Sequence, residues 1–580
     1  MIWHLENPQR TRHERATLEA LTSTADWVTP IRWRVDERLR LIWDADIFAA
    51  GLTFPISLRY PNHFPHSPPL VLPRGVEERW SSHQYGAGGE LCLEYGPDNW
   101  HPDITGADMI LSAHRLLQGE RPATEVRGIV ASRHRTTIGQ DLRGKTTRFM
   151  LTPALMECSR LIPDGAMLSA DVICTFHKET LACVVSSVTM LEGEKWADPS
   201  FPNPLLFEGY KLPAALFRWP AIAPLPSTES RTSFQTSVVE RGLVLPAVRY
   251  ALLVQESRIR AYFLSEDDDT VNEVSVIHPE TAVARLDESH AMLAARKVGI
   301  VGCGSIGSKL AIMLARSGTG KFLLVDDDIL YPENFVRHDL DWRDVATHKV
   351  HSVARRIQLV NPSATCEKRE HRLGGQEASG NIESLMESLA DCDLIVDTTA
   401  DASVFNYLCA VVAFAKKPLL WAEIFGGGFG GLIARHRPLL DPDPASMRRA
   451  IENWCSEQGK PIVRAAIDYG GGFGVPLIAD DADVTTIASH AARMGIDMLI
   501  PRNPSIFPNS VYIIGLAQGW IFERPFETYP IEMGSPALSD VQVAIDPQEA
   551  AAELKRILQL FEANQDATSS SAADSRTPSP

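Results

Sequence analysis

The sequence lacks cysteines at CxxC spacing. Cysteines occur at nine positions: Cys92, Cys158, Cys174, Cys183, Cys303, Cys366, Cys392, Cys409 and Cys455. No two of them form a CxxC pair, so a four-cysteine zinc site has no support. An odd number of cysteines behind a charged N-terminal stretch without an apolar core predicts reduced thiols and a cytoplasmic location.

Basic charge and long apolar runs are also scarce. Lys and Arg number 56 against 73 Asp and Glu, a formal net charge of −17. A general nucleic-acid-binding protein needs a basic surface for phosphate contacts, so direct nucleic-acid binding is not expected. No run of about 18 apolar residues is present, so no membrane span is expected. The hydrophobic share of 44% fits a soluble globular protein.

With 580 residues, the chain is long enough for several domains. Residues 1–145 alternate short strand-like segments with helical ones, which predicts a small antiparallel sheet between helices. Residues 146–285 have strand-like runs, Pro-rich pieces and no chemical motif, which favours an α+β linker domain. Residues 286–545 alternate strands and helices, the rhythm of a doubly wound parallel α/β sheet. A helix over 546–562 and a disordered tail over 563–580 complete the prediction.

A nucleotide-binding loop follows the first strand of the third region. The buried run from Val298 to Val301 leads into Gly302-Cys303-Gly304-Ser305-Ile306-Gly307, and a Leu- and Ala-rich segment follows. Gly302 permits a tight turn, Gly304 lets the backbone approach a phosphate, and Gly307 lets helix and strand pack closely. An acid, Asp326, stands at the end of the next strand. The context predicts nucleotide binding, with Cys303 as a packing residue.

The residues after Asp326 favour ATP over NAD. Asn334 and Arg337 lie just beyond the second strand, and Lys349 follows twelve residues after Arg337. A redox enzyme needs no such cations at the phosphates. A nucleotidyl transfer does, because charge develops on the α-phosphate and on the departing pyrophosphate.

This constellation resembles the ThiF/MoeB/ubiquitin-activating superfamily of Rossmann-type adenylating enzymes. The resemblance implies that Asp326 holds the ribose, that Asn334, Arg337 and Lys349 hold the phosphates, and that Asp328 lies beside them. The family also has an Asp, three residues after the acid ending the next strand, that binds Mg²⁺. Here that position is Ala400, between Asp397 and Asp401. Asp401 is the predicted Mg²⁺ ligand, and Asp397 is the alternative.

A second motif surrounds Cys92. It runs from Tyr60-Pro61 through Phe64-Pro65 and Ser67-Pro68-Pro69 to His83, then Gly89-Glu90-Leu91-Cys92-Leu93 and Trp100-His101-Pro102. Taken alone, Cys92 between two leucines is best explained as a core thiol. The whole motif resembles the ubiquitin-conjugating fold, which implies that Cys92 forms a thioester. That family has His-Pro-Asn where this chain has His83-Gln84-Tyr85, so Asn99 and backbone N–H groups are the candidate oxyanion donors.

Cys455 is the candidate for a second thioester. Activating enzymes of the superfamily that pass on a thioester carry a cysteine in a crossover loop, and Cys455 lies in a polar stretch between a glycine-rich turn and a later helix. The sequence predicts that it is more exposed than Cys366, Cys392 or Cys409. Arg448, Arg449 and Lys460 are near in sequence and would favour the thiolate. The alternative is that Cys455 packs beside Trp454.

The order of the parts resembles the fused conjugating and activating enzymes of bacterial CBASS anti-phage operons. This resemblance implies ATP- and Mg²⁺-dependent adenylation of a protein C-terminus, that of a cyclic-oligonucleotide synthase (CD-NTase). Transfer to Cys455, then to Cys92, then to an amine would follow, in a homodimer. Conjugation of a ubiquitin-like protein and activation of a sulfur carrier remain alternatives. An NAD-dependent oxidoreductase and a nucleotide-sensing scaffold agree less well with Asn334, Arg337 and Lys349.

Overall fold

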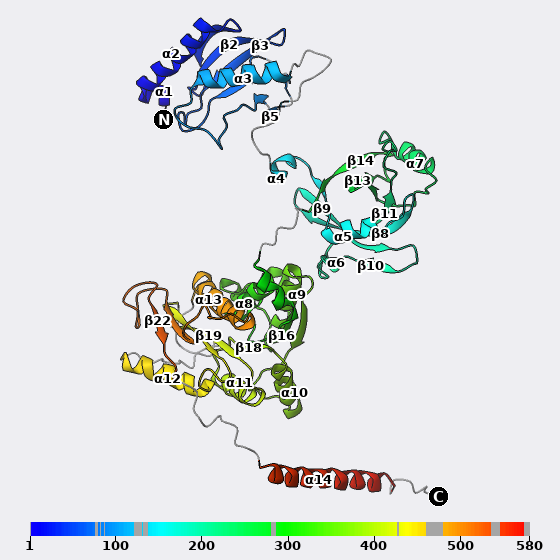
Figure 1. The fold of residues 1–580 in the computed structure, drawn as a ribbon, viewed down its shortest axis with the longest axis vertical. Coiled ribbons are helices and arrows are strands. Elements are labelled where there is room, and N and C mark those ends of the chain that lie inside the picture. The colour runs from blue at the N-terminus through cyan, green and yellow to red at the C-terminus, as the bar shows by residue number, and fades with distance from the viewer. Residues whose placement is uncertain are drawn as a thin grey trace. The chain divides into compact units, whose positions relative to one another are not determined.

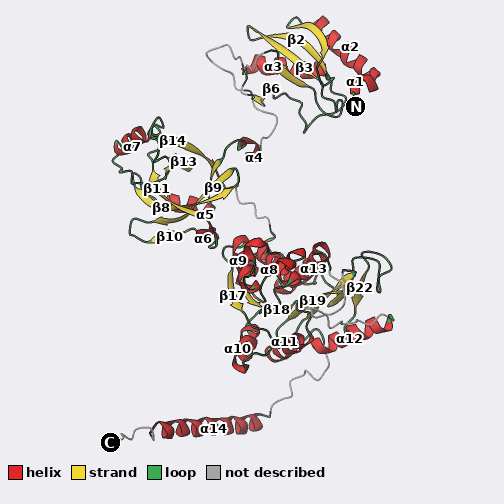
Figure 2. Ribbon diagram, turned by 180° about the vertical axis from the view of Figure 1, so that it is seen from behind, coloured by secondary structure: helices red, strands yellow, loops and turns green. Residues whose placement is uncertain are grey.

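The computed structural model divides into two compact units, Met1–Gly144 and Lys145–Pro580. It describes residues 2–75, 79–81, 83–85, 88–120, 130, 137–279, 286–425, 428–459, 479–534 and 546–573. Lys460, one of the cations expected near Cys455, lies outside these residues. Figure 1 shows the elements coloured along the chain, and Figure 2 shows helices and strands from behind.

The N-terminal unit is a four-stranded antiparallel sheet packed against two helices, in the order β1-β2-β3-β4. The aromatic and aliphatic side chains of the strands form one core with Leu18 of α2 and Ile110 and Leu117 of α3. The antiparallel sheet expected from the alternating segments is confirmed. The elements are α1 (Trp3–Glu6), α2 (Pro8–Thr24), β1 (Val28–Val35), β2 (Leu41–Ala49), β3 (Leu52–Arg59), β4 (Leu70–Pro73), β5 (Gln84–Tyr85), β6 (Glu90–Leu91) and α3 (Gly106–Glu120).

The middle region is a barrel. Strands pair in the order β9-β7-β14-β13-β12-β11-β8, and β8 pairs back with β9 to close the ring, while β10 adds to β9. Where a strand of such a ring pairs with a neighbour on each side, it has no free edge. The elements are α4 (Ile138–Asp141), β7 (Thr147–Met150), α5 (Pro153–Arg160), β8 (Met167–His177), β9 (Thr180–Thr189), β10 (Lys195–Ala197), α6 (Leu205–Glu208), β11 (Tyr210–Arg218), α7 (Arg231–Val239), β12 (Tyr250–Gln255), β13 (Arg258–Leu264) and β14 (Val271–Ile277).

The third region is built on a mixed eight-stranded sheet in the order β17-β16-β15-β18-β19-β20-β21-β22. The parallel, doubly wound arrangement expected from the sequence is confirmed for β15–β19, and β20–β22 are antiparallel. The strands are β15 (Lys297–Val301), β16 (Lys321–Val325), β17 (Thr365–Arg369), β18 (Leu394–Asp397), β19 (Leu419–Phe425), β20 (Gly430–His436), β21 (Val511–Gly515) and β22 (Thr528–Ile531). Chain order reverses at β15 and β18, which makes this the topological switch point of a Rossmann sheet.

Helices cover both faces of this sheet (Figures 1 and 2). One core joins the sheet to α8, α9 and α13, and the other joins it to α10, α11 and α12. The helices are η1 (Glu288–Ala295), α8 (Ser305–Arg316), η2 (Pro332–Val336), η3 (Trp342–Asp344), α9 (Lys349–Val360), α10 (Ser379–Ala390), α11 (Ala402–Ala415), α12 (Pro444–Glu457) and α13 (Asp481–Leu499). The predicted helix from Ser305 is α8.

The last helix is longer than the sequence predicted. Helix α14 (Pro547–Ala573) includes residues 563–573 of the segment expected to be a disordered tail. The sequence contains no Gly or Pro between Pro547 and Pro578, so nothing in it breaks a helix that has begun.

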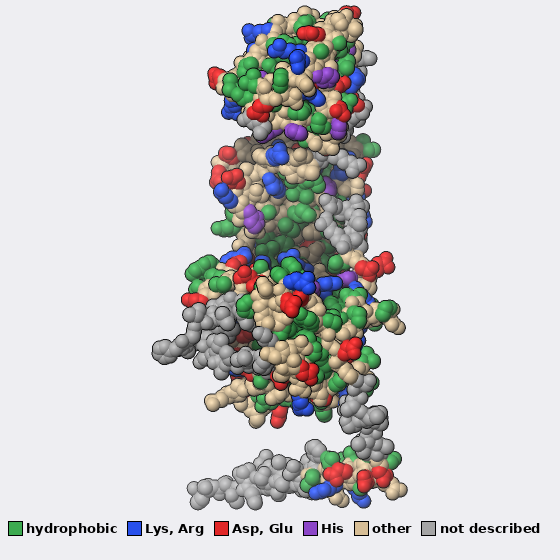
Figure 3. Space-filling model, turned by 90° about the vertical axis from the view of Figure 1, so that its left-hand side faces the viewer, with side chains coloured by type: hydrophobic (Ala, Val, Ile, Leu, Met, Phe, Trp, Pro, Cys, Tyr) green, Lys and Arg blue, Asp and Glu red, His purple; other side chains and the backbone are tan. Residues whose placement is uncertain are grey.

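Within the described residues, no helix has the length and apolarity of a membrane span. Acidic and basic side chains are interspersed on the face of the N-terminal unit drawn in Figure 3.

Candidate functional site

A cavity of about 630 Å³ opens at the switch point, at the carboxyl ends of the parallel strands. Its lining combines the loops that follow β15, β16, β17 and β18 with the start of α9. Such crevices are where open α/β sheets bind ligands. Residues that the sequence singled out and that line it are Gly302, Gly304, Asp326, Asp328, Asn334, Arg337, Lys349 and Asp401.

The glycine loop has the backbone geometry that required glycine. Gly302 has φ +91°, in the left-handed region, and its N–H donates to the Val325 carbonyl. A Cβ on Gly307 would lie 1.9 Å from the Gly302 carbonyl oxygen, so the first turn of α8 can pack there only with glycine. Gly307 therefore shapes the loop from outside the cavity lining. The N-terminus of α8 faces the cavity with its positive dipole end.

Asp326 ties the second strand to this loop. One carboxylate oxygen accepts from the Cys303 N–H at 2.6 Å, and the other accepts from the Asp328 N–H at 2.9 Å. Burial raises the pKa of Asp326, and the backbone hydrogen bonds and Lys349 work in the opposite direction. Cys303 is fully buried, as predicted, and burial raises the pKa of its thiol.

Lys349 is a buried cation at the start of α9, paired with the Asp328 carboxylate. Its backbone N–H also donates to the Asp328 carbonyl, which fixes the helix start against the loop after β16. Asn334 lies in η2, where its side-chain oxygen accepts from the Tyr331 N–H at 3.0 Å. Arg337 follows at the end of η2 and lines the same cavity. An amide, a guanidinium and an ammonium thus lie around one space, as phosphate recognition requires.

Asp401 is placed at the cavity rim, where both of its carboxylate oxygens have protein partners. Its Oδ1 caps α11, accepting from the Ser403 N–H at 2.7 Å and the Ser403 hydroxyl at 2.6 Å, and its Oδ2 pairs with Arg372. Burial alone would raise the pKa of Asp401, but these contacts hold that pKa below its usual value. Ala400 beside it has φ +56°. Within the described part of the chain, no group of three or more His, Cys, Asp or Glu is arranged to hold a metal.

Asp397, the alternative metal ligand, does not line the cavity. It is buried, and its carboxylate accepts from the Thr399 N–H at 2.9 Å and the Thr399 hydroxyl at 2.7 Å. Burial raises the pKa of Asp397 to about 6, against the hydrogen bonds from Thr399. Because Asp397 stabilises the turn after β18 and Asp401 is engaged on both oxygens, the side chains do not form a ready Mg²⁺ site.

Cys92 lies just after β6 in the N-terminal unit and is half-buried. Its N–H donates to the His83 carbonyl at 2.6 Å, and the Trp100 indole donates to the Pro65 carbonyl at 2.7 Å. These hydrogen bonds therefore join separated pieces of the motif, Cys92 with His83 and Trp100 with Pro65. Asn99 is occupied locally, because its side-chain amide donates to the Glu94 carbonyl. Its side chain is thus committed to a turn in this conformation.

The expectation that Cys455 is exposed is wrong. Cys455 lies in α12 with none of its surface exposed, whereas Cys366 and Cys409 are half-buried. Met447, Ile451 and Cys455 recur at four-residue intervals, which puts all three on the buried face of a helix whose other faces are polar. Burial and Glu452 raise the pKa of Cys455 to about 11. The expected positive surroundings are therefore not found among the described residues.

The sequence reading missed several residues that line the cavity. Arg372 and His371 follow β17, and Thr398 and Thr399 follow β18. The Thr398 hydroxyl donates to the Gly302 carbonyl at 2.6 Å. His338 holds the same loop through its Nε2 and the Cys303 carbonyl, 2.8 Å apart, and burial lowers its pKa to about 4. For the residues after β17 and β18, the available signal was their position just beyond the carboxyl end of a parallel strand.

A doubly wound sheet with a glycine-rich loop and cations at its switch point defines a Rossmann-type domain, the architecture in which nucleotides bind at the switch point. Residues 281–435 match the ThiF family.

The chain is also related to Cap2 proteins. It is 31% identical over 221 residues to the ATP-dependent ubiquitin transferase-like protein Cap2 of Pseudomonas aeruginosa, a match covering 36% of each chain. It is 29% identical over 136 residues to the Sulfur carrier protein ThiS adenylyltransferase of Escherichia coli, covering 23% of this chain and 51% of that protein. The solved structure of E. coli MccB with ATP covers 43% of this chain and 67% of that chain at 16% identity and a TM-score of 0.34. The chain thus spans little more than a third of the Cap2 relative.

Proposed function

We propose that this chain uses ATP to adenylate the C-terminal carboxylate of a protein and passes the acyl group through Cys455 to Cys92 and then to an amine. The observation that carries the first step is the meeting of Arg337, Lys349 and the glycine loop around one cavity at the switch point. The ThiF-family match over the same segment supports it.

Adenylation needs charge stabilisation on phosphate oxygens rather than covalent help from the protein. The substrate carboxylate oxygen attacks the α-phosphorus of ATP, and the bond to pyrophosphate breaks. In the proposal, the α8 N-terminus receives the phosphates, Asp326 receives the ribose, and Asn334, Arg337 and Lys349 offset the developing charge. Lys349 starts from an ion pair with Asp328, so nucleotide binding would divide its charge between two anionic groups. Asp328 pairs with Lys349 and Asp401 pairs with Arg372, so the proposal assigns charge stabilisation to the amide and the cations of the cavity.

Acyl transfer follows through two thioesters. The Cys455 thiolate attacks the acyl carbon and AMP leaves, the Cys92 thiolate attacks the thioester and Cys455 leaves, and an amine finally displaces Cys92. Each step replaces one hard displacement with easier ones. Because Cys455 is buried, the last turn of α12 has to open before this thiol can react.

The proposed substrate is the C-terminus of a CD-NTase, the acceptor is an amine on another molecule, and the proposed active form is a homodimer with ATP as its Mg²⁺ complex. The resemblance of the Cys92 motif to ubiquitin-conjugating enzymes, and the relation to the Cap2 proteins, support conjugation. A ubiquitin-like substrate is an alternative that keeps the same chemistry. Activation of a sulfur carrier would use the adenylation cavity but leave Cys92 without a role.

ATP–pyrophosphate exchange tests the first step. We expect the full chain to exchange labelled pyrophosphate into ATP when a candidate CD-NTase with its intact C-terminus is added. Removing the last residues of that CD-NTase should abolish exchange. Exchange that needs no protein carboxylate, or NAD reduction in place of exchange, would contradict the proposal.

A further inference from the structure

Two neighbouring strands of the barrel separate before they end. β13 and β14 pair from Leu264↔Val271 to Ala261↔Val274. Beyond that point, residues 275–277 of β14 pair with β7, and residues 258–260 of β13 pair with β12. The ring of strands is therefore open between residues 258–260 and 275–277.

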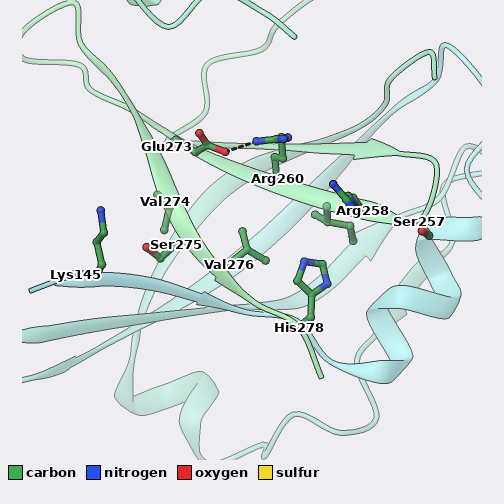
Figure 4. A pocket seen from close by; sticks show the side chains of 10 residues that line it. Lys145, Ser257, Arg258, Arg260, Glu273, Val274, Ser275, Val276 and His278 are labelled. Carbon is green, nitrogen blue, oxygen red and sulfur yellow. Dashed lines mark hydrogen bonds and ion pairs between the residues drawn. The ribbon is translucent and has the colours of Figure 1, made fainter. Parts of the chain in front are cut away.

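A cavity of about 770 Å³ lies at this opening. Its volume is within the range of about 300–1,000 Å³ typical of ligand pockets. The buried side chains of Ile259 and Val274 contribute apolar surface together with the half-buried Val276. In Figure 4, Lys145, Val276 and His278 lie on one side of the opening, and Arg258 and Ser257 lie on the other.

The opening exposes strand edges. Successive residues of a strand direct their N–H and C=O groups to opposite sides. Because residues 258–260 and 275–277 each have a paired strand on one side only, alternate backbone groups of both segments point into the gap without a strand partner. Such edges accept an added strand, whose main chain supplies the missing hydrogen bonds.

The rim of this opening is cationic in a chain whose formal net charge is −17. Lys145, Arg258 and His278 are exposed around it, and none of the three has an ion pair with a described residue. The one carboxylate in the lining, Glu273, already pairs with Arg260 at 2.8 Å. Charge therefore selects an anionic occupant, and the strand edges and apolar surface select an extended one.

We propose that the opening between β13 and β14 is a docking site for an extended peptide segment that carries acidic side chains. The peptide main chain pairs with the free edges of β13 and β14. Its apolar side chains contact Val274 and Val276, and its carboxylates lie near Lys145 and Arg258. This proposal is independent of the adenylation chemistry and assigns the barrel a recognition role.

The test uses the full chain and a fluorescein-labelled, amide-capped peptide of sequence Glu-Val-Glu-Val-Glu. We expect saturable binding by fluorescence anisotropy. Methylating alternate backbone nitrogens of the peptide should weaken binding by about tenfold or more, because each methyl group removes a ladder hydrogen bond. The Lys-Val-Lys-Val-Lys peptide should not bind. Hydrogen exchange should slow at amides in residues 258–260 and 275–277 on binding.

Two charge reversals complete the test. Arg258→Glu should weaken binding by about tenfold, and Arg241→Glu, at an exposed position of the same barrel outside the cavity, should not. ATP–pyrophosphate exchange should be equal in both variants, which separates this result from any failure of the proposed enzyme activity. Equal binding of the N-methylated peptide would reduce the site to a charge attraction and overturn strand addition. Absence of saturable binding, or protection elsewhere in the barrel, would overturn the proposal.

Discussion

The guanidinium of Arg372 lies 3.2 Å from the carboxylate of Asp401 at the rim of the nucleotide cavity. Arg372 lies in the loop after β17 and Asp401 in the loop after β18, two strands that β16 and β15 separate in the sheet. The same carboxylate caps α11. The Arg372 side chain is 57% exposed, so the ion pair adds little stability by itself. The capping hydrogen bonds are therefore the larger contribution of Asp401.

Replacing Asp401 separates capping from metal binding. Asp401→Ala should lower stability by about 1 kcal/mol, the usual cost of losing an N-cap, and reduce the melting temperature accordingly. Asp401→Asn should melt close to the native protein, because Asn caps helices as well as Asp. We also expect Asp401→Asn to need the same Mg²⁺ concentration for half-maximal pyrophosphate exchange. A rise of tenfold or more would restore Asp401 as a metal ligand.

Removing the cavity cations should affect chemistry more than folding. Arg337→Ala and Lys349→Ala should each lower the rate of pyrophosphate exchange by roughly 10²–10³-fold, the effect of losing one preorganised stabilising group. Lys349→Ala also leaves Asp328 without its partner, so it should raise the KM for ATP as well. The matched control is Arg316→Ala, an exposed arginine at the end of α8. Equal loss in the control would show a general effect on the domain.

The two candidate thioester cysteines differ in the rate at which they react with iodoacetamide. Cys92 is half-buried, whereas Cys455 is fully buried with a pKa raised to about 11. At pH 8, Cys92 should be alkylated at least tenfold faster, because Cys455 is both covered and protonated. Peptide mass mapping over time gives both rates.

The same cysteines can be tested for acyl transfer. After incubation with ATP and substrate, Cys92→Ser should hold a thiol-resistant ester in place of a thiol-sensitive adduct. Cys455→Ala should abolish any adduct on Cys92, and Cys409→Ala should not. An adduct on Cys92 that forms normally in Cys455→Ala would remove Cys455 from the relay.

Asp397 should make stability fall as pH rises. Its pKa is about 6 in the folded protein and 3.8 ordinarily, so the folded state binds more protons between these values. Stability is therefore greatest below about pH 4 for this group and is reduced by of the order of 2–3 kcal/mol above pH 6. Asp397→Asn removes the buried charge and keeps the oxygen that accepts from Thr399. It should raise the melting temperature at pH 8 more than at pH 5, and the reverse order would contradict this account.

Local patterns predicted the glycine loop and the residues around it, because Gly302 and Gly307 occupy positions where the backbone tolerates no side chain. Cys455 could not be placed in this way. Its segment is rich in charged residues, and the face formed by Met447, Ile451 and Cys455 is buried because α12 packs against the sheet. The barrel could not be predicted either, because the ring closes only when β8 pairs with β9 as well as with β11. The sequence thus predicts features that depend on neighbouring residues, such as the glycine loop. Features that depend on contacts between distant segments, such as the burial of Cys455 and the closure of the barrel, require the structure.

Ala400 has a left-handed backbone that alanine adopts at a cost and that Asp and Asn tolerate better. The loop after β18 thus has a backbone shape that suits aspartate better than the alanine that occupies it. The alanine codons GCU and GCC each differ from an aspartate codon by one base, so one such change would introduce a carboxylate here without rebuilding the backbone. The local backbone conformation is therefore compatible with aspartate at position 400 as well as with the alanine that is present.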